Sequence, residues 1–477
     1  MAQLSRNVTA LARVWYDGGM RKRRKVCNPR LASSKHTLAT GNRDHARRRQ
    51  VATPSDCEIE QRLNDLVKPV VFAELDHYRR LGLRNRILSL PVMVSLVLAM
   101  LWRQVPGVTA LQRLLATERL LWTEPTQVSQ PALSERFLTF PAELFERVLY
   151  GVLARLPDRQ QTRTRPVPPL LERVVGRFAA CYAVDGTVLE ALFRKLKALQ
   201  EIPEAPLAGH LVAVCDLLSH LPVRVWYAEN PATNDKAFLP QLLAWLPRDS
   251  LLVFDLGYFS FPFFDAVTEA GSWFVTRLRD KTSYTVQHVL LDRPQARDQI
   301  VHLGQYRSNR SHHPLRLIEV YVNGAWRRYL TNVLDPERLS VLQVVALYEQ
   351  RWQIETAFAL VKRLLGLAYL WVGSRNGVLL QVWATWLYYA VLIDLCDEVA
   401  EALHLPLDRI SVEMVSRSLY FYVQATAQGY PGTAAQYLAQ DAKLLGIVKR
   451  RRARDGPSAL TQVSLALEPD LTSPPGG

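Results

Sequence analysis

Apolar residues recur at intervals of three and four along the first third of the chain, a spacing that is typical of amphipathic helices. The pattern predicts helices over residues 58–80, 90–103, 109–116 and 141–156. A run rich in Arg, Thr and Pro follows at 160–169 and indicates a linker. We therefore predict a helical N-terminal domain over 53–165, which a linker over 166–174 joins to the rest of the chain.

The pattern changes after residue 175, where apolar runs shorten to the length of strands. We predict helices over 235–246 and after Ser260, and strands over 177–185, 210–216, 223–227, 251–255 and 273–278. Three early strands followed by alternating helices and strands favour a mixed sheet in an α/β fold. Segments of alternating apolar and polar residues at 283–291, 315–322 and 326–333 then predict three strands of a β-rich insertion over 282–334.

Helical spacing returns near residue 342. We predict a long helix over 342–367, an apolar helix over 378–395 and a helical C-terminal region over 400–448. The sheet domain is then expected to cover 175–399. Residues 449–477 begin with a basic run and become rich in Pro and Gly, so we expect a frayed tail.

Charge is distributed unevenly along the 477 residues. The chain has 59 Lys and Arg against 44 Asp and Glu, a net charge of +15. Residues 1–50 hold 13 basic and 2 acidic side chains, so they account for +11 of this excess. With 49% hydrophobic residues the chain as a whole is not disordered. The basic arm over 1–52, however, is expected to be disordered until it binds a polyanion such as nucleic acid.

Cysteines and apolar runs bear on the cellular location. The five cysteines are scattered and show no zinc or disulfide spacing, which favours a reducing, cytoplasmic compartment. The longest apolar runs, 87–102 and 377–393, are 16 and 17 residues long and are interrupted by polar residues or Pro. We therefore expect no membrane span and no secretory signal.

The most informative segment is YEQRWQIETAFALVK over 348–362. At about 100° per residue, four of its polar residues fall within an arc of about 60°, with apolar residues opposite: Tyr348, Arg351, Glu355 and Lys362. One face would pack on a core, while the other presents a phenol, a guanidinium, a carboxylate and an ammonium group. A solvated helix face with an Arg–Glu pair four residues apart would give the same pattern.

Two aspartates follow apolar runs that we predict to be strands, Asp185 before Gly186 and Asp255 shortly before Gly257. At the ends of neighbouring buried strands they would lie where ligands of α/β folds collect, although a turn-capping role is the common alternative for each. Together with Glu355 they would bring three carboxylates to one place. Two Mg²⁺ ions about 3.5–4 Å apart would balance these charges and one phosphodiester. Hard oxygen ligands favour Mg²⁺, or Mn²⁺ in its place, over zinc.

These residues resemble the signature of the DDE transposases of bacterial insertion sequences, in the group called the IS-four family. The group is marked by Y-x2-R-x3-E-x6-K, which is matched without a departure by Tyr348, Arg351, Glu355 and Lys362. The runs DGT at 185–187, DLGYFS at 255–260 and FVTRL at 274–278 also look like the family. The resemblance implies an RNase-H-like catalytic core with a β-strand insertion between the second Asp and the Glu.

The resemblance also implies a mechanism. Two divalent metal ions held by Asp185, Asp255 and Glu355 would serve to cut the transposon end, to form and resolve a hairpin, and to join the freed 3′ end to target DNA. The phosphates of the DNA would be gripped by the other three signature residues, Tyr348, Arg351 and Lys362.

Further expectations concern DNA and partners. Trp326 lies close to where this group places an aromatic residue that receives a flipped base, with strand packing as the alternative. The helical domain over 53–165 would bind DNA. The implied partners are double-stranded DNA, as terminal inverted repeats and target, and a second copy of the chain in a synaptic homodimer.

Three other functions stay open on the sequence. A glycoside hydrolase would use carboxylates as acid and base without metal, and would stay active in EDTA. A transposase relic would bind DNA without cutting it, and an RNase-H-type nuclease would cut without transposing. Rival carboxylates fall mid-strand, at helix starts or in turns, where capping is expected: Asp216, Asp235, Asp265 and Asp280.

Overall fold

The computed structural model describes residues 57–83, 86–105, 107–189, 209–306, 310–363, 374–449 and 458–468. The predicted basic arm over 1–52 and most of the basic run at 449–454 lie outside these residues. The described residues belong to one compact unit, Ala46–Gly477. The domain boundaries drawn from the sequence therefore stay predictions.

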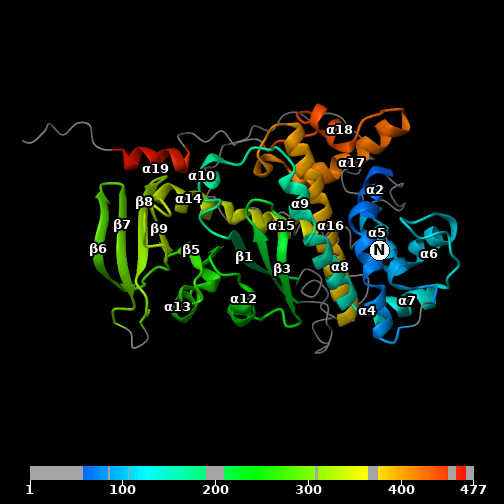
Figure 1. Ribbon diagram of the computed structural model, residues 1–477, viewed down its shortest axis with the longest axis horizontal. Coiled ribbons are helices and arrows are strands. Elements are labelled where there is room, and N and C mark those ends of the chain that lie inside the picture. Colours follow the sequence, from blue (N-terminus) through cyan, green and yellow to red (C-terminus); the bar gives the residue numbers. More distant parts are fainter. Residues whose placement is uncertain are drawn as a thin grey trace, which may run out of the picture. The chain divides into compact units, whose positions relative to one another are not determined.

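A nine-stranded sheet forms the centre of this unit (Figure 1). Its strands are β1 (Ala180–Val188), β2 (His210–Asp216), β3 (Pro222–Ala228), β4 (Ser250–Phe254), β5 (Trp273–Arg277), β6 (Tyr284–Arg293), β7 (Ala296–Leu303), β8 (Leu315–Val322) and β9 (Ala325–Thr331). The strand β7 was not predicted. Its alternation is concealed because the inward position Asp298 is polar, and its carboxylate is buried in an ion pair with Arg316 of β8 at 2.5 Å.

The order of strands in the sheet is β3-β2-β1-β4-β5-β9-β8-β7-β6. Among the described strands, β1 and β4 and likewise β4 and β5 pair in parallel, and the other neighbours pair antiparallel. Because β5 pairs with β9, the strands of the predicted insertion continue the sheet instead of forming a separate one. The mixed α/β sheet predicted from the sequence is confirmed.

Helices before the sheet are α2 (Cys57–Leu66), α3 (Lys68–Ala73), α4 (Leu75–Arg80), α5 (Leu90–Trp102), α6 (Val108–Thr117), α7 (Gln130–Thr139), α8 (Glu143–Leu153), α9 (Leu156–Gln161) and α10 (Pro169–Glu172). The single helix predicted over 58–80 is therefore three short ones. Proline near the start of α3 accounts for one break, because it lacks the N–H that a continuing helix needs. The unpredicted α7 starts at an ordinary signal, since Ser129 accepts a hydrogen bond from the Ala132 N–H.

Helices within and after the sheet are α12 (Leu239–Trp245), α13 (Phe261–Glu269), α14 (Val341–Gln350), α15 (Trp352–Arg363), α16 (Arg375–Ala402), α17 (Val412–Ala427), α18 (Ala434–Gln440) and α19 (Ala459–Leu467). Short 3₁₀ turns are η2 (Asp235–Phe238), η3 (Leu256–Tyr258) and η4 (Leu407–Arg409). The long helix predicted over 342–367 is two helices, α14 and α15, which meet at Arg351. There the hydrogen bonds tighten to three-residue spacing, from Arg351 N–H to Tyr348 O and from Ile354 N–H to Arg351 O.

The predicted tail is partly helical. Ser458 caps α19 by accepting a hydrogen bond from the Thr461 N–H, and the buried side chains Ala459 and Val463 join the main core. Gln462 of α19 exchanges two hydrogen bonds with Asn323 in the turn between β8 and β9. The expectation of a frayed tail is therefore wrong for residues 458–468, because a capped apolar helix finds a surface to cover.

Side chains alternate between the two faces of the sheet, and each face has its own core. On one face, Cys181 and Ala183 of β1 belong to the core that includes α14, α15, α16 and the helices before and after the sheet. On the other face, Val184 of β1 belongs to the core that includes α12 and α13. The predicted helical flanks are thus confirmed, and they share the core of the sheet.

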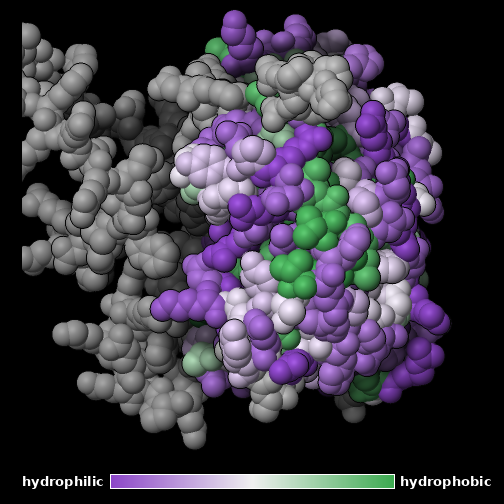
Figure 2. Space-filling view, turned by 90° about the vertical axis from the view of Figure 1, so that its left-hand side faces the viewer, coloured by the Kyte–Doolittle hydropathy of each residue, from purple (hydrophilic) through white to green (hydrophobic). Residues whose placement is uncertain are grey.

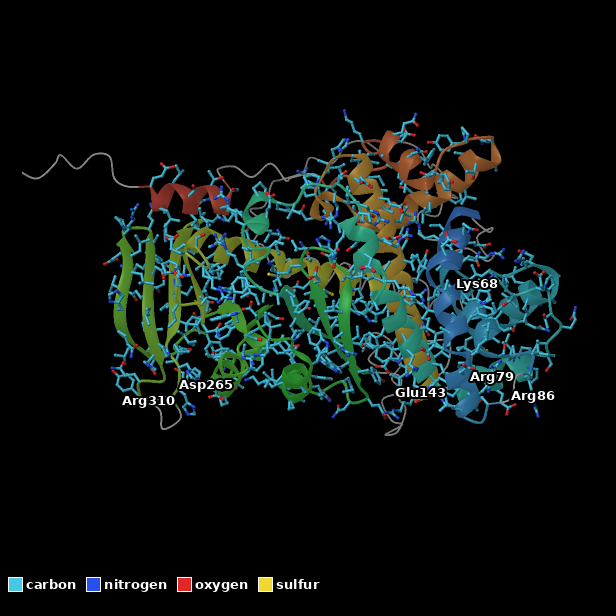
Figure 3. All side chains as sticks on the ribbon, in the orientation of Figure 1. Lys68, Arg79, Arg86, Glu143, Asp265 and Arg310 are labelled. Atoms are coloured by element: carbon cyan, nitrogen blue, oxygen red, sulfur yellow. The ribbon has the colours of Figure 1, made fainter. Side chains whose placement is uncertain are left out.

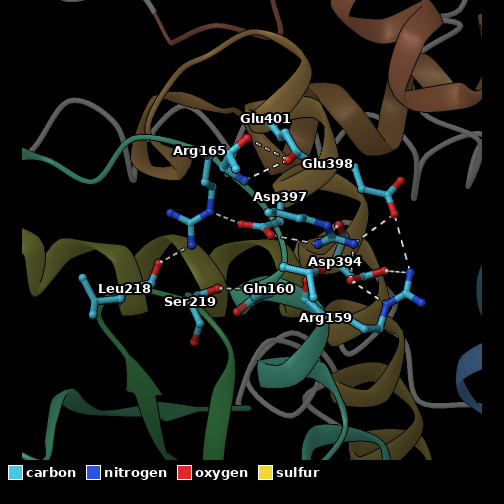
Figure 4. A network of polar contacts seen from close by, with 12 residues as sticks. Arg159, Gln160, Arg165, Leu218, Ser219, Asp394, Asp397, Glu398 and Glu401 are labelled. Atoms are coloured by element: carbon cyan, nitrogen blue, oxygen red, sulfur yellow. Dashed lines mark hydrogen bonds and ion pairs between the residues drawn. The ribbon is translucent and has the colours of Figure 1, made fainter.

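Helix α16 lies at the centre of the larger core. By length and composition it could cross a membrane, but 94% of its most apolar window is buried inside the protein. Near its C-terminal end it carries Asp394 and Asp397, both fully buried. Arginines of α2, α9 and the segment after α9 surround these carboxylates, among them Arg163 at 2.8 Å from each. Figure 4 shows Arg159 and Arg165 beside them. This ion-pair network fastens the N-terminal helices to α16.

Strand β6 forms the free edge of the sheet. Seen from this side, the surface shows an apolar band among polar side chains (Figure 2), and Val286 and Val289 of β6 are exposed. Its pairing with β7 shifts register twice, between Val286 and His288 and between Val289 and Leu291. Such irregularities make an edge a poor template for a further strand.

Candidate functional site

Asp185 and Asp255 come together through the register of two parallel strands. The last paired positions of β1 and β4 are Val184 and Phe254, so the two aspartates are the next residue on each chain. Neighbouring strands lie about 4.8 Å apart. Asp185 and Asp255 therefore lie side by side, directly after the point where the parallel pairing of β1 and β4 ends.

The two aspartates are held differently. Strand β1 continues past Asp185 to Val188 by pairing with β2, contrary to the prediction that Asp185 ends its strand. Asp185 is 9% exposed and accepts a hydrogen bond from the Gly186 N–H at 2.9 Å. Asp255 follows β4 as predicted, and it caps η3 by accepting the Gly257 N–H at 2.7 Å.

Arg351 connects Asp185 with Glu355. It lies at the junction of α14 and α15 and is 5% exposed. One guanidinium nitrogen donates to Asp185 Oδ2 at 3.2 Å, and the other donates to Glu355 Oε1 at 2.7 Å. Side chains predicted to lie on the opposite face of this segment are buried, among them Ile354, Ala357, Leu360 and Val361. The structure thus brings Asp185, Asp255, Arg351 and Glu355 together.

The electrostatics of Asp185 reflect its burial first and the neighbouring carboxylates second. Burial, and then the negative charge of Asp255, raise the pKa of Asp185 from 3.8 to about 7. Arg351 opposes this shift, and Glu355 adds a smaller upward effect. Burial disfavours the charged carboxylate, and repulsion from the neighbouring carboxylates is only partly offset by Arg351. A cation bound at this position would relieve that repulsion.

The candidate ligands for the predicted divalent metal are Asp185, Asp255 and Glu355. Three carboxylates supply the hard oxygen ligands that Mg²⁺ and Mn²⁺ prefer. Among the described residues, however, no three or more His, Cys, Asp or Glu side chains are arranged so that they could bind one metal ion. The guanidinium of Arg351 lies between two of the three carboxylates instead. The residues fit a metal by their chemistry, and Arg351 is the group that separates them here.

The other signature residues also face this region. Lys362 of α15 donates a hydrogen bond to Thr187 Oγ1, two residues after Asp185 on β1. Tyr348 packs against Tyr329 of β9, with ring centroids 5.4 Å apart. Burial raises the pKa of Tyr348, while Arg351 and then Arg277 oppose the rise. Arg277, exposed at the end of β5, is therefore a further basic group close to the site.

Trp326 is not brought to these residues by any contact that the structure gives. It is 39% exposed on β9, where its ring meets Tyr321 at 5.6 Å and the guanidinium of Arg297 at 5.2 Å. By alternation it shares a face with Leu330, whereas Tyr329, which packs on Tyr348, points to the other face. Its role in receiving a base stays a prediction.

Three of the four rival carboxylates have structural partners away from the candidate site, and of these only Asp216 caps a turn as predicted. Asp216 accepts the N–H groups of Leu218 and Ser219 in a turn. Asp265 of α13 accepts the backbone N–H groups of His312 and His313, which ties down the loop beside it (Figure 3). Asp280 pairs with Arg328 at the surface.

Asp235 is the exception, because its partner is a histidine of a separate strand, which its local sequence does not indicate. The cap of η2 is made by Asn234, which accepts the Lys236 N–H, so the prediction that Asp235 caps this turn is wrong. Asp235 instead contacts His210 of β2 at 2.7 Å. Burial, and then Asp235, Asp185 and Asp255, raise the pKa of the buried Tyr258. One signal was available in the sequence: of the adjacent Asn234 and Asp235, only one is needed as a cap.

Comparisons with known proteins agree with the resemblance. Residues 180–390 match the family described as the transposase DDE domain. The protein named "Putative transposase y4zB" from Sinorhizobium fredii is 31% identical over 153 residues, which cover 29% of this chain and 41% of that protein. This chain therefore spans less than half the length of that relative.

A solved structure of the piggyBac transposase synaptic complex with hairpin DNA is 12% identical, with a TM-score of 0.36, over 86% of this chain and 90% of that chain. A TM-score this low does not establish a common fold. Residues 180–390 are thus similar to the DDE domain of transposases, and this range includes every site residue predicted from the sequence.

Proposed function

We propose that the protein is a DDE transposase that cuts DNA at the ends of an insertion sequence and joins the freed 3′ end to target DNA. The observation that carries the proposal is the register of β1 and β4, which sets Asp185 beside Asp255, with Glu355 linked to Asp185 through Arg351. Strands β1–β5, with β2 antiparallel to β1 and with β4 and β5 parallel to it, would be an RNase-H-like core.

Asp185, Asp255 and Glu355 would hold two divalent metal ions in this proposal. When bound, Mg²⁺ or Mn²⁺ would activate the attacking water or 3′-hydroxyl and stabilise the leaving oxygen of an in-line displacement. Before DNA arrives, Arg351 neutralises part of the charge of Asp185 and Glu355. We infer that Arg351 leaves at least one carboxylate when metal and DNA bind, which frees its guanidinium for a phosphate oxygen.

Basic side chains around the carboxylates support a DNA substrate. Lys362 lies against β1, and the exposed Arg277 and Arg327 lie at the ends of β5 and β9 near Tyr329. Together they would grip phosphates on both sides of the cleaved bond.

Hairpin formation, with Trp326 receiving a flipped base, and a synaptic homodimer belong to the same proposal. So does a cytoplasmic location on nucleoid DNA, which the free cysteines Cys181, Cys215 and Cys396 support.

One observation favours a second candidate. The pKa of Asp185, about 7, would suit the general acid of a glycoside hydrolase. The neighbouring carboxylate of Asp255 and the guanidinium of Arg351 between Asp185 and Glu355 favour a site for cations and phosphate instead. Hydrolysis of glycosides in EDTA would identify the hydrolase.

The test is cleavage of labelled DNA that carries the gene's own flanking inverted repeats, in Mg²⁺, resolved on a denaturing gel. We expect Asp185→Asn, Asp255→Asn and Glu355→Gln each to abolish cleavage, because the amide keeps the size but loses the anionic ligand. All three variants should still bind the DNA in EDTA. Asp280→Asn is the matched control, since Asp280 is 88% exposed and should be dispensable.

Three outcomes would change the proposal. An amide variant that cleaves at the wild-type rate removes that residue from the metal site. Wild-type cleavage that survives EDTA rules out a metal-dependent step. Specific binding to the inverted repeats without cleavage in Mg²⁺ or Mn²⁺ would identify a transposase relic.

A further inference from the structure

Asp235 lies between the chain segments that follow the two candidate aspartates. A Cβ atom added to Gly186 would lie 1.9 Å from Asp235 Oδ1. A Cβ added to Gly257 would lie 2.8 Å from Asp235 Oδ2 and 2.8 Å from Asp255 Oδ1. One oxygen of Asp235 thus lies against the α-carbon next to Asp185, and the other borders the same space at Gly257 as the Asp255 carboxylate.

These contacts account for two glycines whose conformation does not require glycine. Neither Gly186, inside β1, nor Gly257, in η3, has a positive φ. A side chain at Gly186 would displace Asp235, and one at Gly257 would crowd the carboxylates of both Asp235 and Asp255. The two glycines are needed so that the Asp235 carboxylate can fit between β1 and η3.

Asp235 is itself held in place by His210. A carboxylate only accepts hydrogen bonds, so Nε2 of His210 carries the hydrogen in the 2.7 Å contact with Oδ1. The His210 side chain is 8% exposed and packs against Phe238 with ring centroids 5.8 Å apart. Its other ring nitrogen, Nδ1, is buried and has no hydrogen-bond partner among the described residues. Among the described residues, Asp235 is therefore the hydrogen-bond partner of the His210 imidazole.

We propose that Asp235, fixed by His210, is a positioning residue that sets the spacing between Asp185 and Asp255. It packs against the residue after Asp185 and against the turn that Asp255 caps, so it controls how far apart the two strand ends lie. This inference rests on the proposed metal-dependent cleavage. Removing a residue that orients metal ligands typically lowers metal affinity or activity by roughly 10–100-fold.

The experiment has one arm that needs neither metal nor DNA. Thermal unfolding of Gly186→Ala, Asp235→Ala and the double variant forms a cycle. We expect Gly186→Ala to lower the Tm of the wild type clearly and to have a smaller effect once Asp235 is Ala, because the closest contact of the added Cβ is then removed and only the contact with His210 Nε2 at 2.8 Å is left. Equal effects in both backgrounds would show that Asp235 does not lie against Gly186 and would overturn the inference.

A second arm measures cleavage against Mg²⁺ concentration. Asp235→Ala should lower cleavage at limiting Mg²⁺ by roughly 10–100-fold, with partial recovery at high Mg²⁺ and unchanged DNA binding in EDTA. Asp235→Asn keeps the size and the acceptor for His210, so it should restore most activity. Asp216→Ala, at the other end of β2, is the structural control, and it should lower the Tm without changing the Mg²⁺ dependence.

The outcomes separate this inference from the proposed function. If the wild type neither cleaves nor responds to Mg²⁺ while the Tm cycle shows coupling, the proposed function fails and the contact stands. If the wild type cleaves and Asp235→Ala has the wild-type Mg²⁺ dependence, the positioning role is wrong. If Asp235→Asn is as inactive as Asp235→Ala at an unchanged Tm, the charge of Asp235 is what matters, and positioning by packing is overturned.

Discussion

At the scale of single residues, Arg351 is the group that balances the negative charge of the candidate site. Its guanidinium lies between Asp185 and Glu355 and also packs near the rings of Tyr348 and Trp352, at 5.7 and 5.0 Å. Without metal, this arrangement compensates two carboxylates that would otherwise repel each other. Arg351 therefore serves the metal-free protein, in addition to the phosphate contact expected from the sequence.

Arg351→Ala should consequently destabilise the metal-free protein. Loss of a hydrogen bond to a charged group costs roughly 1.5–3 kcal/mol, and protonation of Asp185 can offset part of the second loss. We expect a decrease of this size in the free energy of unfolding, measured with denaturant in EDTA. Arg79→Ala is the control, because it removes an Arg–Asp pair three residues apart whose side chains are 61% and 78% exposed, and it should cost at most about 1 kcal/mol. Equal losses for the two variants would contradict a special role for Arg351.

The protonation of Asp185 leads to a pH prediction. Burial and Asp255 raise its pKa to about 7 from 3.8, so between these values the folded protein binds more protons than the unfolded chain. This group's contribution to stability is therefore present at low pH and falls as the pH rises through 7. Mg²⁺ must displace the proton, so the increase in Tm on adding Mg²⁺ should be larger above pH 7 than below it. In Asp185→Asn that pH dependence should vanish; a wild-type Mg²⁺ response that is flat across pH 7 would argue against Asp185 as a ligand.

At the scale of elements, the hairpin of β8 and β9 determines where Trp326 lies. Its two-residue turn consists of Asn323 and Gly324, with φ of 54° and 77°, the left-handed pair that suits the twist of a hairpin. This turn fixes the register in which Tyr321 lies opposite Trp326. The hairpin thus presents an exposed pair of aromatic rings with Arg297 over one of them.

Trp326→Ala should leave the fold intact, because the side chain is 39% exposed, and should impair the hairpin steps of DNA cleavage. Stacking on a base contributes roughly 1–3 kcal/mol, so hairpin formation should slow while first-strand nicking is nearly unchanged. Trp326→Phe retains a ring and should recover part of the rate. A time course that resolves nicked, hairpin and fully cleaved DNA gives the answer, and equal slowing of nicking and hairpin formation would exclude a base-stacking role.

At the scale of the whole described unit, α16 joins the parts. Four arginines from the N-terminal side meet Asp394, Asp397 and Glu398 at its end: Arg62, Arg159, Arg163 and Arg165. Burial alone would raise the pKa of Asp394, but Arg163, Arg62 and Arg159 hold it below its ordinary value. Asp394 is therefore charged in the interior and depends on these partners.

Arg163→Ala should be the most damaging single change in this network. Arg163 is 7% exposed and binds Asp394, Asp397 and Glu398 at 2.8–2.9 Å, so its loss removes a partner from two fully buried carboxylates, at a cost of up to about 3–5 kcal/mol. Arg159→Ala is the matched control, since Arg159 is 42% exposed with contacts of 3.3–3.6 Å and should cost at most about 1 kcal/mol. Chemical denaturation measures both, and similar small losses would show that the network does not hold the helices together.

Local patterns in the sequence determined the elements and part of the candidate site. Apolar runs of strand length and alternating segments together located eight of the nine strands, and the arc of Tyr348, Arg351, Glu355 and Lys362 identified the opposite, apolar side of its segment as buried. They did so because alternation and helical spacing depend only on near neighbours along the chain. Strand β7 was not predicted because the carboxylate at its inward position Asp298 interrupts the apolar alternation. The partner that makes its burial possible, Arg316, lies 18 residues away.

Contacts between distant residues were decided by the tertiary structure alone. The register that sets Asp185 beside Asp255, the guanidinium of Arg351 between two carboxylates, and the packing of Asp235 against Gly186 and His210 each join separate elements. No local spacing encodes them, because sheet order and helix docking minimise the free energy of the whole core.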